Sequence, residues 1–137
     1  LNANYTYIDS DDWLIGNSDG EVKRYSRYLN KIYAKLIARL DGSSDITVTT
    51  QWFGLKAKGI EPHSDMYSRG DDFNFSQFAL QARYRKKLDN GSSVYLVYSH
   101  NGIDDSLEDD IDFSQLASNA IANPLQKSIT AKINWVF

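Results

Sequence analysis

Apolar and polar residues alternate through the C-terminal stretch of the chain, residues 128–137. One side of this stretch is apolar and ends in two aromatic residues: Ile129, Ala131, Ile133, Trp135 and Phe137. Because successive side chains of an extended strand point to opposite faces, the pattern predicts a two-faced β-strand. Its apolar face needs an apolar partner, which is either a protein core or the hydrocarbon of a bilayer with aromatic residues at its boundary.

The same alternation predicts five earlier strands, at residues 2–8, about 24–40, 45–58, about 73–88 and from 94 onward. The 24–40 segment is the clearest. Its even positions are mostly apolar (Tyr28, Ile32, Ala34, Leu36, Ala38, Leu40), and its odd positions include Arg27, Lys31, Lys35 and Arg39. At roughly 17 residues it is much longer than the five or six residues of an ordinary strand.

The predicted connections alternate between short and long. Residues 41–44 and 89–93 are tight turns, and the second carries the Asn90-Gly91 hairpin signal. The long connections are residues 9–23, 60–72 and 101–124, the last with a locally helical stretch around 113–121. In an antiparallel meander this order places the short turns and the C-terminus at one end, which is typical of outer-membrane barrels. A lipocalin-like barrel would show it only by accident.

We therefore predict an all-β fold, an antiparallel transmembrane β-barrel to which residues 1–137 contribute about six strands of a larger meander barrel as one structural unit. About eight strands are the minimum for a single-chain membrane barrel, and an open edge in hydrocarbon leaves backbone groups unpaired. We expect the remaining strands upstream of Leu1 or on other chains. Because the sequence opens without an initiating Met or a signal peptide, we expect a mature or partial chain.

The composition argues against membrane helices, nucleic-acid binding and cysteine chemistry. No apolar run approaches the roughly 18 to 20 residues of a membrane helix, and a mean hydropathy of -0.49 does not separate a soluble protein from a barrel with a polar lumen. A net charge of -3 argues against a nucleic-acid surface. The absence of Cys excludes disulfides, thiolate metal sites and Cys nucleophiles.

Basic residues occupy the sides of the strands that lie opposite the apolar sides. The set comprises Lys35, Arg39, Arg83, Arg85 and Lys132. In a soluble protein these side chains are solvated, whereas in a membrane barrel they line the lumen, because an Arg on the lipid face costs about 2 to 4 kcal/mol. Within a lumen they either favour anions or pair with carboxylates from the absent strands, and both alternatives stay open.

The remaining candidate sites are weak. Ser99 and His100 are adjacent on a strand, so they point to opposite faces and cannot act together as nucleophile and base. His63 lies in a polar loop and with Asp65 could contact a metal ion, but a solvated His is the simpler interpretation. Six acidic residues follow within one segment: Asp104, Asp105, Glu108, Asp109, Asp110 and Asp112. The segment lacks the ligand spacing and central Gly of an EF-hand loop. It is either a solvated loop or binds divalent ions that bridge it to lipopolysaccharide. We expect no enzyme activity, no cofactor and no metal.

Two segments carry a resemblance to a known family. Residues 49–55, together with the hairpin of residues 78–85 and 91–99, resemble the C-terminal region of the DUF5916 family over roughly residues 46–137. That resemblance implies a large outer-membrane-associated protein with an N-terminal family 9-like carbohydrate-binding domain and a C-terminal barrel, and it implies no reaction. The C-terminal residues resemble the β-signal read by the barrel-assembly machinery, with the membrane-facing set Ile129, Ile133, Trp135 and Phe137.

Together these patterns predict an outer-membrane β-barrel segment that acts as the anchor or conduit of a larger envelope protein in the bacterial outer membrane. The expected partners are the lipid bilayer and lipopolysaccharide, the barrel-assembly machinery and the remaining barrel strands, with no nucleic acid. The alternative is a soluble β-barrel or sandwich that binds a ligand or carbohydrate through its aromatic residues. Recovery in the aqueous fraction without detergent would favour that alternative.

Overall fold

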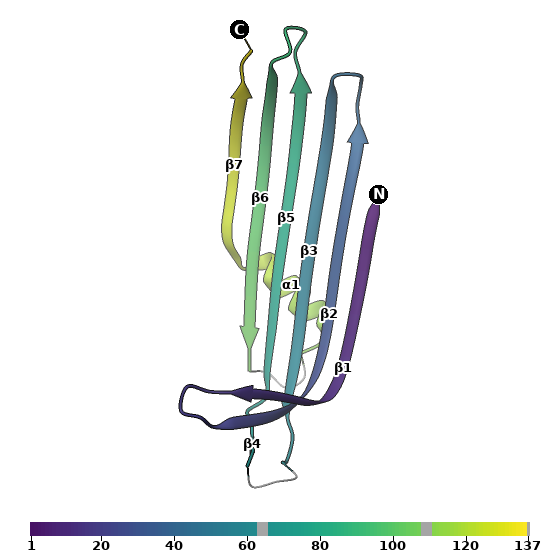
Figure 1. Cartoon of the computed structure of the whole chain (residues 1–137). Coiled ribbons are helices and arrows are strands. Elements are labelled where there is room, and N and C mark those ends of the chain that lie inside the picture. The colour runs from purple at the N-terminus through teal and green to yellow at the C-terminus, as the bar shows by residue number, and fades with distance from the viewer. Residues whose placement is uncertain (63–65, 108–110, 137) are drawn as a thin grey trace.

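The computed structural model describes residues 1–62, 66–107 and 111–136, and it contains one β-sheet with one helix packed on it (Figure 1). The elements are β1 (Asn2–Gly16), β2 (Val22–Arg39), β3 (Ser44–Gly59), β4 (Ser68–Arg69), β5 (Phe73–Lys87), β6 (Ser93–Ser106), α1 (Phe113–Ala122) and β7 (Pro124–Asn134). The six long strands lie in the order β1-β2-β3-β5-β6-β7, each antiparallel to its neighbours. The two-residue β4 pairs with β2 in parallel.

The sheet is open. β1 and β7 form its two edges, and within the described residues they do not close it into a barrel. The predicted all-β antiparallel architecture with six long strands is confirmed at this level. No helix in the described part of the chain is long and apolar enough to cross a membrane.

Both short turns lie at one end of the sheet together with the C-terminal end of the chain (Figure 1). We call this the turn end, and the opposite end, where the other connections lie, the loop end. Asp41 and Asn90 accept hydrogen bonds from backbone N–H groups in the two turns, and Gly91 has a φ of 83°. These are the side-chain capping and positive φ that tight hairpins use.

Two predicted loop boundaries were wrong. Residues 9–23 were expected to form a long loop, but β1 and β2 run together as far as Gly16 and Val22. A bulge between Ser10 and Trp13 bends this hairpin, whose tip then crosses over one face of the sheet (Figure 1). The 101–124 loop was also placed too early, because β6 continues to Ser106.

The hairpin tip is held down by an aromatic cluster. The Trp13 ring lies 6.0 Å from that of Tyr25 and 6.3 Å from that of Phe73, and Tyr25 and Phe73 pack edge to face at 5.5 Å. The Arg27 guanidinium lies 5.1 Å from the Trp13 ring centroid. Arg24 donates to Asp12 at 2.6 Å across the hairpin. The polar residues Asp12 and Arg24 therefore pair across the two strands of the hairpin instead of forming a loop.

The predicted local helix is present as α1, on the opposite face of the sheet from the hairpin tip (Figure 1). Its N-terminus carries a capping box: Asp112 accepts from the Gln115 N–H at 2.8 Å, and the Gln115 side chain accepts from the Asp112 N–H at 3.0 Å. The hydrogen bonds donated by the Gln115 N–H and the Ser114 hydroxyl lower the pKa of Asp112. Leu116 is buried against the sheet.

Small residues let α1 lie close to the strands. Gly54, Ser76 and Gly102 sit beneath it, and a Cβ at Gly102 would collide with the Ala120 carbonyl oxygen. By contrast, a Cβ added at Gly42 in the first turn would meet no atom within 4 Å. Gly102 therefore fixes the distance between helix and sheet.

We predict that Gly102→Ala destabilises the fold by about 1 to 3 kcal/mol, because the new methyl group forces α1 away from β6. Chemical unfolding of the two proteins measures this difference. Gly42→Ala is the matched control and should change the free energy of unfolding by less than about 0.5 kcal/mol. Equal effects of the two substitutions would contradict the close packing of α1.

Candidate functional surfaces

The strand register sorts the side chains into an apolar face and a polar face. On the apolar face, hydrogen-bonded neighbours form continuous rows across the sheet. One row is Ala38, Ile46, Tyr84, Leu96 and Ala131, and the next is Leu36, Val48, Ala82, Tyr98 and Ile129. The two rows nearer the loop end are Ala34, Thr50, Leu80, His100 and Lys127, then Tyr5, Ile32, Trp52, Phe78 and Gly102. These four rows span roughly 20 Å along the strands.

Large aliphatic side chains of the two rows nearest the turn end are exposed, as is Tyr5 at the β1 end of the loop-end row, because the described chain places nothing over them; α1 covers Trp52 and Gly102. Ile129 is 74% exposed, Tyr5 62%, Leu36 47% and Leu96 47%. Isolated proteins rarely leave so large a continuous apolar patch in contact with water. A patch of this kind is typical of surfaces that contact lipid, another protein or an apolar ligand.

An aromatic row marks the loop-end border of the apolar face. Trp52 donates its indole N–H to Ser76 at 2.8 Å and packs edge to face on Phe113 of α1. Tyr5 donates to the Asn30 amide oxygen at 2.5 Å. A groove of about 490 Å³ lies between α1 and this border, lined mostly by apolar side chains that include Ile32, Phe78, Ala117 and Ile121.

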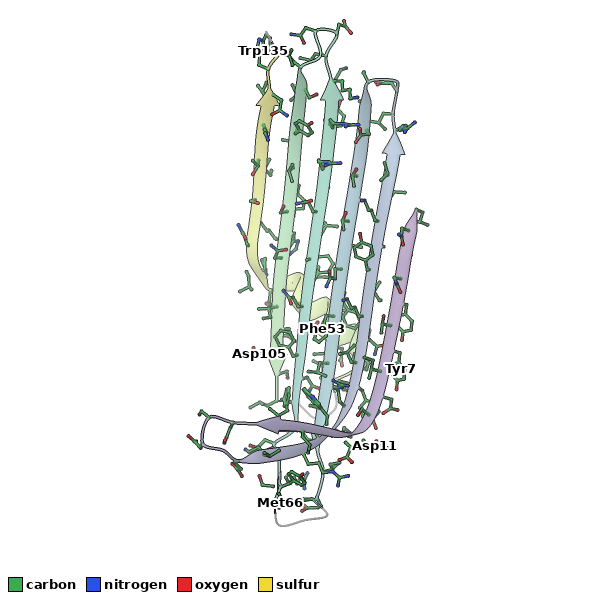
Figure 2. The ribbon with its side chains drawn as sticks, viewed as in Figure 1. Tyr7, Asp11, Phe53, Met66, Asp105 and Trp135 are labelled. Atoms are coloured by element: carbon green, nitrogen blue, oxygen red, sulfur yellow. The ribbon has the colours of Figure 1, made fainter. Side chains whose placement is uncertain are left out.

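The C-terminal residues predicted to face the membrane lie on this apolar side of β7 or follow it. Ile133 pairs with Val94 and is 64% exposed. Trp135 follows the end of β7 at the turn end of the sheet (Figure 2) and is 58% exposed. Phe137 lies outside the described residues.

The polar face carries all five predicted basic residues. Arg39, Arg85 and Lys132 share one row with Asp45 and Tyr95. Arg83 lies in the next row and Lys35 in the one after. Lys31 and Lys87 also lie on the polar face. The predicted basic set omitted both residues, although they fit the same period-two alternation along β2 and β5.

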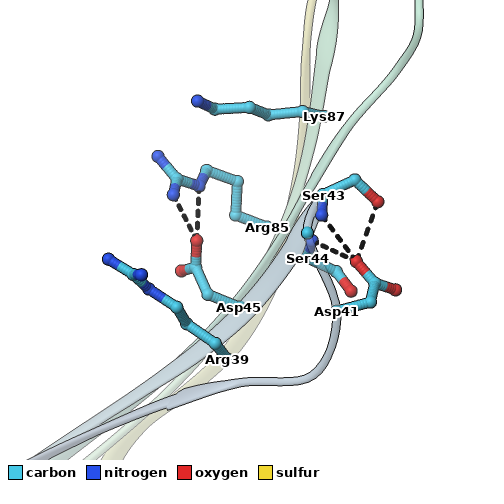
Figure 3. A pocket seen from close by; sticks show the side chains of 8 residues that line it. Arg39, Asp41, Ser43, Ser44, Asp45, Arg85 and Lys87 are labelled. Atoms are coloured by element: carbon cyan, nitrogen blue, oxygen red, sulfur yellow. Dashed lines mark hydrogen bonds and ion pairs between the residues drawn. The ribbon is translucent and has the colours of Figure 1, made fainter.

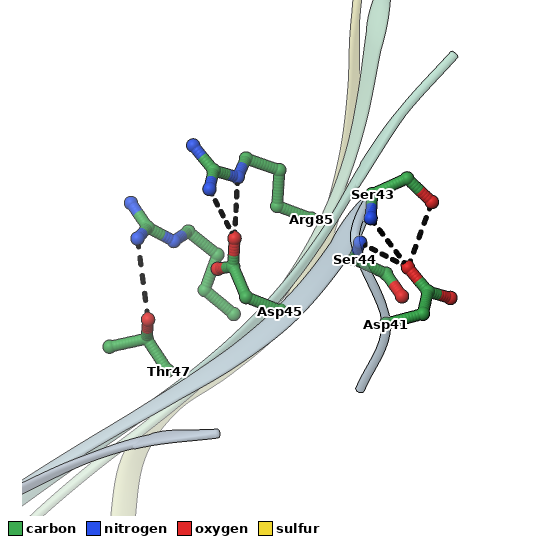
Figure 4. A network of polar contacts seen from close by, with 7 residues as sticks. Asp41, Ser43, Ser44, Asp45, Thr47 and Arg85 are labelled. Atoms are coloured by element: carbon green, nitrogen blue, oxygen red, sulfur yellow. Dashed lines mark hydrogen bonds and ion pairs between the residues drawn. The ribbon is translucent and has the colours of Figure 1, made fainter. Parts of the chain in front are cut away.

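One of these cations is paired within the chain. Arg85 forms an ion pair with Asp45 and donates its Nε–H to that carboxylate at 2.7 Å (Figure 4). The Asp45 side chain is only 10% exposed. Arg83 reaches only a neutral acceptor, the Thr47 hydroxyl at 3.4 Å. The partner of Arg85 thus comes from β3 and does not require an absent strand.

Arg39 and Lys87 project to the same side as this ion pair (Figure 3). Together they line a hollow of about 270 Å³ beside the first turn. Neither has an ion-pair partner among the described residues. In the turn itself, hydrogen bonds from Ser44 and Ser43 hold the pKa of Asp41 well below its usual range.

The register places Ser99 and His100 on opposite faces, as their adjacency requires. Ser99 pairs with Gln81 on the polar face and His100 with Leu80 on the apolar face. His100 is 8% exposed, and its ring packs edge to face on Phe78 at 5.6 Å. His63 and Asp65 lie outside the described residues. Within the described ranges, no three potential metal ligands of the His, Cys, Asp or Glu type come together.

The acidic segment is not one continuous solvated loop. Asp104 and Asp105 belong to β6, and Asp104 accepts from the Asn119 amide of α1 at 3.2 Å. Asp112 caps that helix. Glu108, Asp109 and Asp110 lie outside the described residues. At least three of these carboxylates therefore stand in the sheet or at a helix cap.

The sheet and its two contrasting faces define an all-β protein with an open antiparallel meander. The family model described as "Domain of unknown function (DUF5916)" matches residues 37–137. The chain belongs to this family. Searches of curated proteins and of solved structures found no match.

We predict that Asp45→Asn destabilises the fold by about 1.5 to 3 kcal/mol, the usual contribution of a hydrogen bond to a charged group. The substitution removes the charge that pairs with Arg85 and keeps the side-chain volume. Chemical unfolding of Asp45→Asn, Arg85→Gln and the double variant isolates the pair. Arg83→Gln is the control, since its contact with Thr47 is long and neutral. Additive single effects would show that the two side chains do not interact.

Proposed function

We propose that this chain forms part of the wall of a transmembrane β-barrel in a bacterial outer membrane, where it anchors a larger envelope protein or lines its conduit. The observation that carries the proposal is the uncovered apolar face. Its rows continue from β2 to β7, while the other face of the same strands is polar and basic. Lipid on one side and a wet lumen on the other would satisfy both faces.

Strand length and turn placement support this function. The long strands have 11 to 18 residues, whereas a tilted strand needs about 9 to 11 to cross a bilayer. The part beyond the bilayer is then the loop end, where α1 and the hairpin tip cover the sheet. The aromatic row with Trp52 and Phe78 lies where the apolar rows end, as in the aromatic girdles of membrane barrels.

A barrel wall also requires partners for β1 and β7. Their outer edges are unpaired in the described sheet, and such edges are costly in hydrocarbon. In the proposed barrel, further strands of the same protein or of other chains complete the closure, because six strands fall below the minimum of about eight. The barrel-assembly machinery would insert these strands, and lipopolysaccharide would contact the outer leaflet side.

Cysteine labelling tests the orientation directly, since the chain has no native Cys. Ile129→Cys and Thr130→Cys are adjacent and both exposed, but they lie on opposite faces. In proteoliposomes of the complete natural protein, a charged, aqueous thiol reagent should label the Thr130→Cys variant at least about tenfold faster, because hydrocarbon shields the apolar face. A fluorophore on the Ile129→Cys variant should be quenched by brominated acyl chains.

Leu36→Cys and Ile37→Cys on β2 provide a matched second pair, because both native residues are exposed aliphatic side chains on opposite faces. The same contrast is expected. Equal labelling of the two members of each pair, with the protein recovered in the aqueous fraction without detergent, would instead support the soluble binding module. Protection of the Ile129→Cys variant without quenching by brominated lipid would indicate a protein partner on the apolar face.

A further inference from the structure

The turn half of the polar face carries an excess of positive charge. From the row of Lys31 to the turn end, its described members include seven cationic side chains and one carboxylate. The cations are Lys31, Lys35, Arg39, Arg83, Arg85, Lys87 and Lys132, and the carboxylate is Asp45. The equivalent rows of the apolar face hold only Lys86, Lys127 and His100 as basic residues. The charge is thus specific to one face.

The geometry concentrates this charge. Arg39 and Arg85 lie in one row with a single strand between them, which separates their backbones by roughly 10 Å. That distance equals about one Debye length at 0.1 M salt, so the two charges are not fully screened from each other. Asp45 between them is engaged by Arg85, which leaves Arg39 and Lys87 unpaired among the described residues.

A hollow adjoins these groups. The 270 Å³ space beside the first turn is lined by the cations Arg39, Arg85 and Lys87, by the carboxylates Asp41 and Asp45, and by the serines of the turn (Figure 3). Asp45 is engaged by Arg85, and Asp41 accepts hydrogen bonds from Ser43 and Ser44, so the hollow keeps one net positive charge. Guanidinium groups recognise phosphate-like oxyanions through planar, paired N–H donors, and Lys adds a point charge.

We propose that the polar face binds multivalent oxyanions of the phosphate class at a site centred on Arg39, Arg85 and Lys87. Lys132 lies at the far end of the row that contains Arg39 and Arg85. The proposal rests on the proposed function in one respect, that this face looks into a water-filled lumen that soluble anions reach. Carboxylates from other barrel strands are the competing way to neutralise the face, and they would leave no anion site.

Titration calorimetry with inorganic tripolyphosphate tests the site on the complete natural protein in detergent solution. The double variant Arg39→Gln/Lys87→Gln should weaken binding about tenfold or more, because it removes the two cations of the hollow that have no ion-pair partner among the described residues. Lys86→Gln/Lys127→Gln is the matched control, because it removes the same charge from the other face, and its affinity should stay within about twofold. Raising NaCl from roughly 0.05 to roughly 0.5 M should weaken binding to the unmodified protein.

A parallel titration with short-chain phosphatidic acid separates a soluble phosphate from a lipid phosphate, and tripolyphosphate should bind more tightly. Absence of binding, equal loss in the two double variants, or preference for phosphatidic acid would each overturn the proposal. The cysteine labelling is independent of this result. If lipid protects the cysteines of the apolar face but tripolyphosphate does not bind, the anion site is refuted and the proposed barrel is not. If tripolyphosphate binds but lipid protects neither face, the proposed barrel is refuted and the anion site is not.

Discussion

The strand register is the constraint on which both surfaces depend. Each long strand alternates with period two, and the pairings of β2, β3 and β5 run without a slip through the turn half of the sheet. A shift of one residue in any strand would carry its cations to the apolar side and its aliphatic residues to the polar side. The two irregularities, at Ser10/Trp13 and Asn101/Gly102, lie near the loop end, so the rows of the turn half stay continuous.

The two halves of the sheet are stabilised differently. The loop half has its own small core, with α1 on one face and the hairpin tip on the other, and it buries Tyr25, Leu55 and Leu116. Among the described residues nothing covers the apolar face of the turn half, although burial of each large aliphatic side chain contributes about 1.5 to 3 kcal/mol. The buried residues therefore gather in the loop half, and in the proposed barrel a bilayer would cover the apolar face of the turn half.

The sequence predicts the strands because alternation over many residues has one structural solution, and it predicts the second turn because Asn90-Gly91 favours a tight hairpin. The hairpin tip was missed because Asp11 and Asp12 have the composition of a loop, yet Asp12 gains a cross-strand partner in Arg24. The pairing of Asp45 with Arg85 depends on the register of β3 against β5, which alternation does not determine. The closeness of α1 to Gly102 depends on tertiary packing in the same way.

The net charge of the chain does not reflect the local charge of the polar face. The chain is acidic overall at -3, yet most of its acidic residues lie in turns or in the loop half, while the polar face of the turn half is strongly basic. Solvent screens exposed charges that lie more than a Debye length apart, so distant carboxylates neutralise this face poorly. Neutralisation must come from groups that approach the face itself. Asp45 is engaged by Arg85, and Asp41 at the first turn is the other described carboxylate that lines the same hollow. Two carboxylates do not balance the seven cations of this face, so further strands or dissolved anions would have to supply the rest.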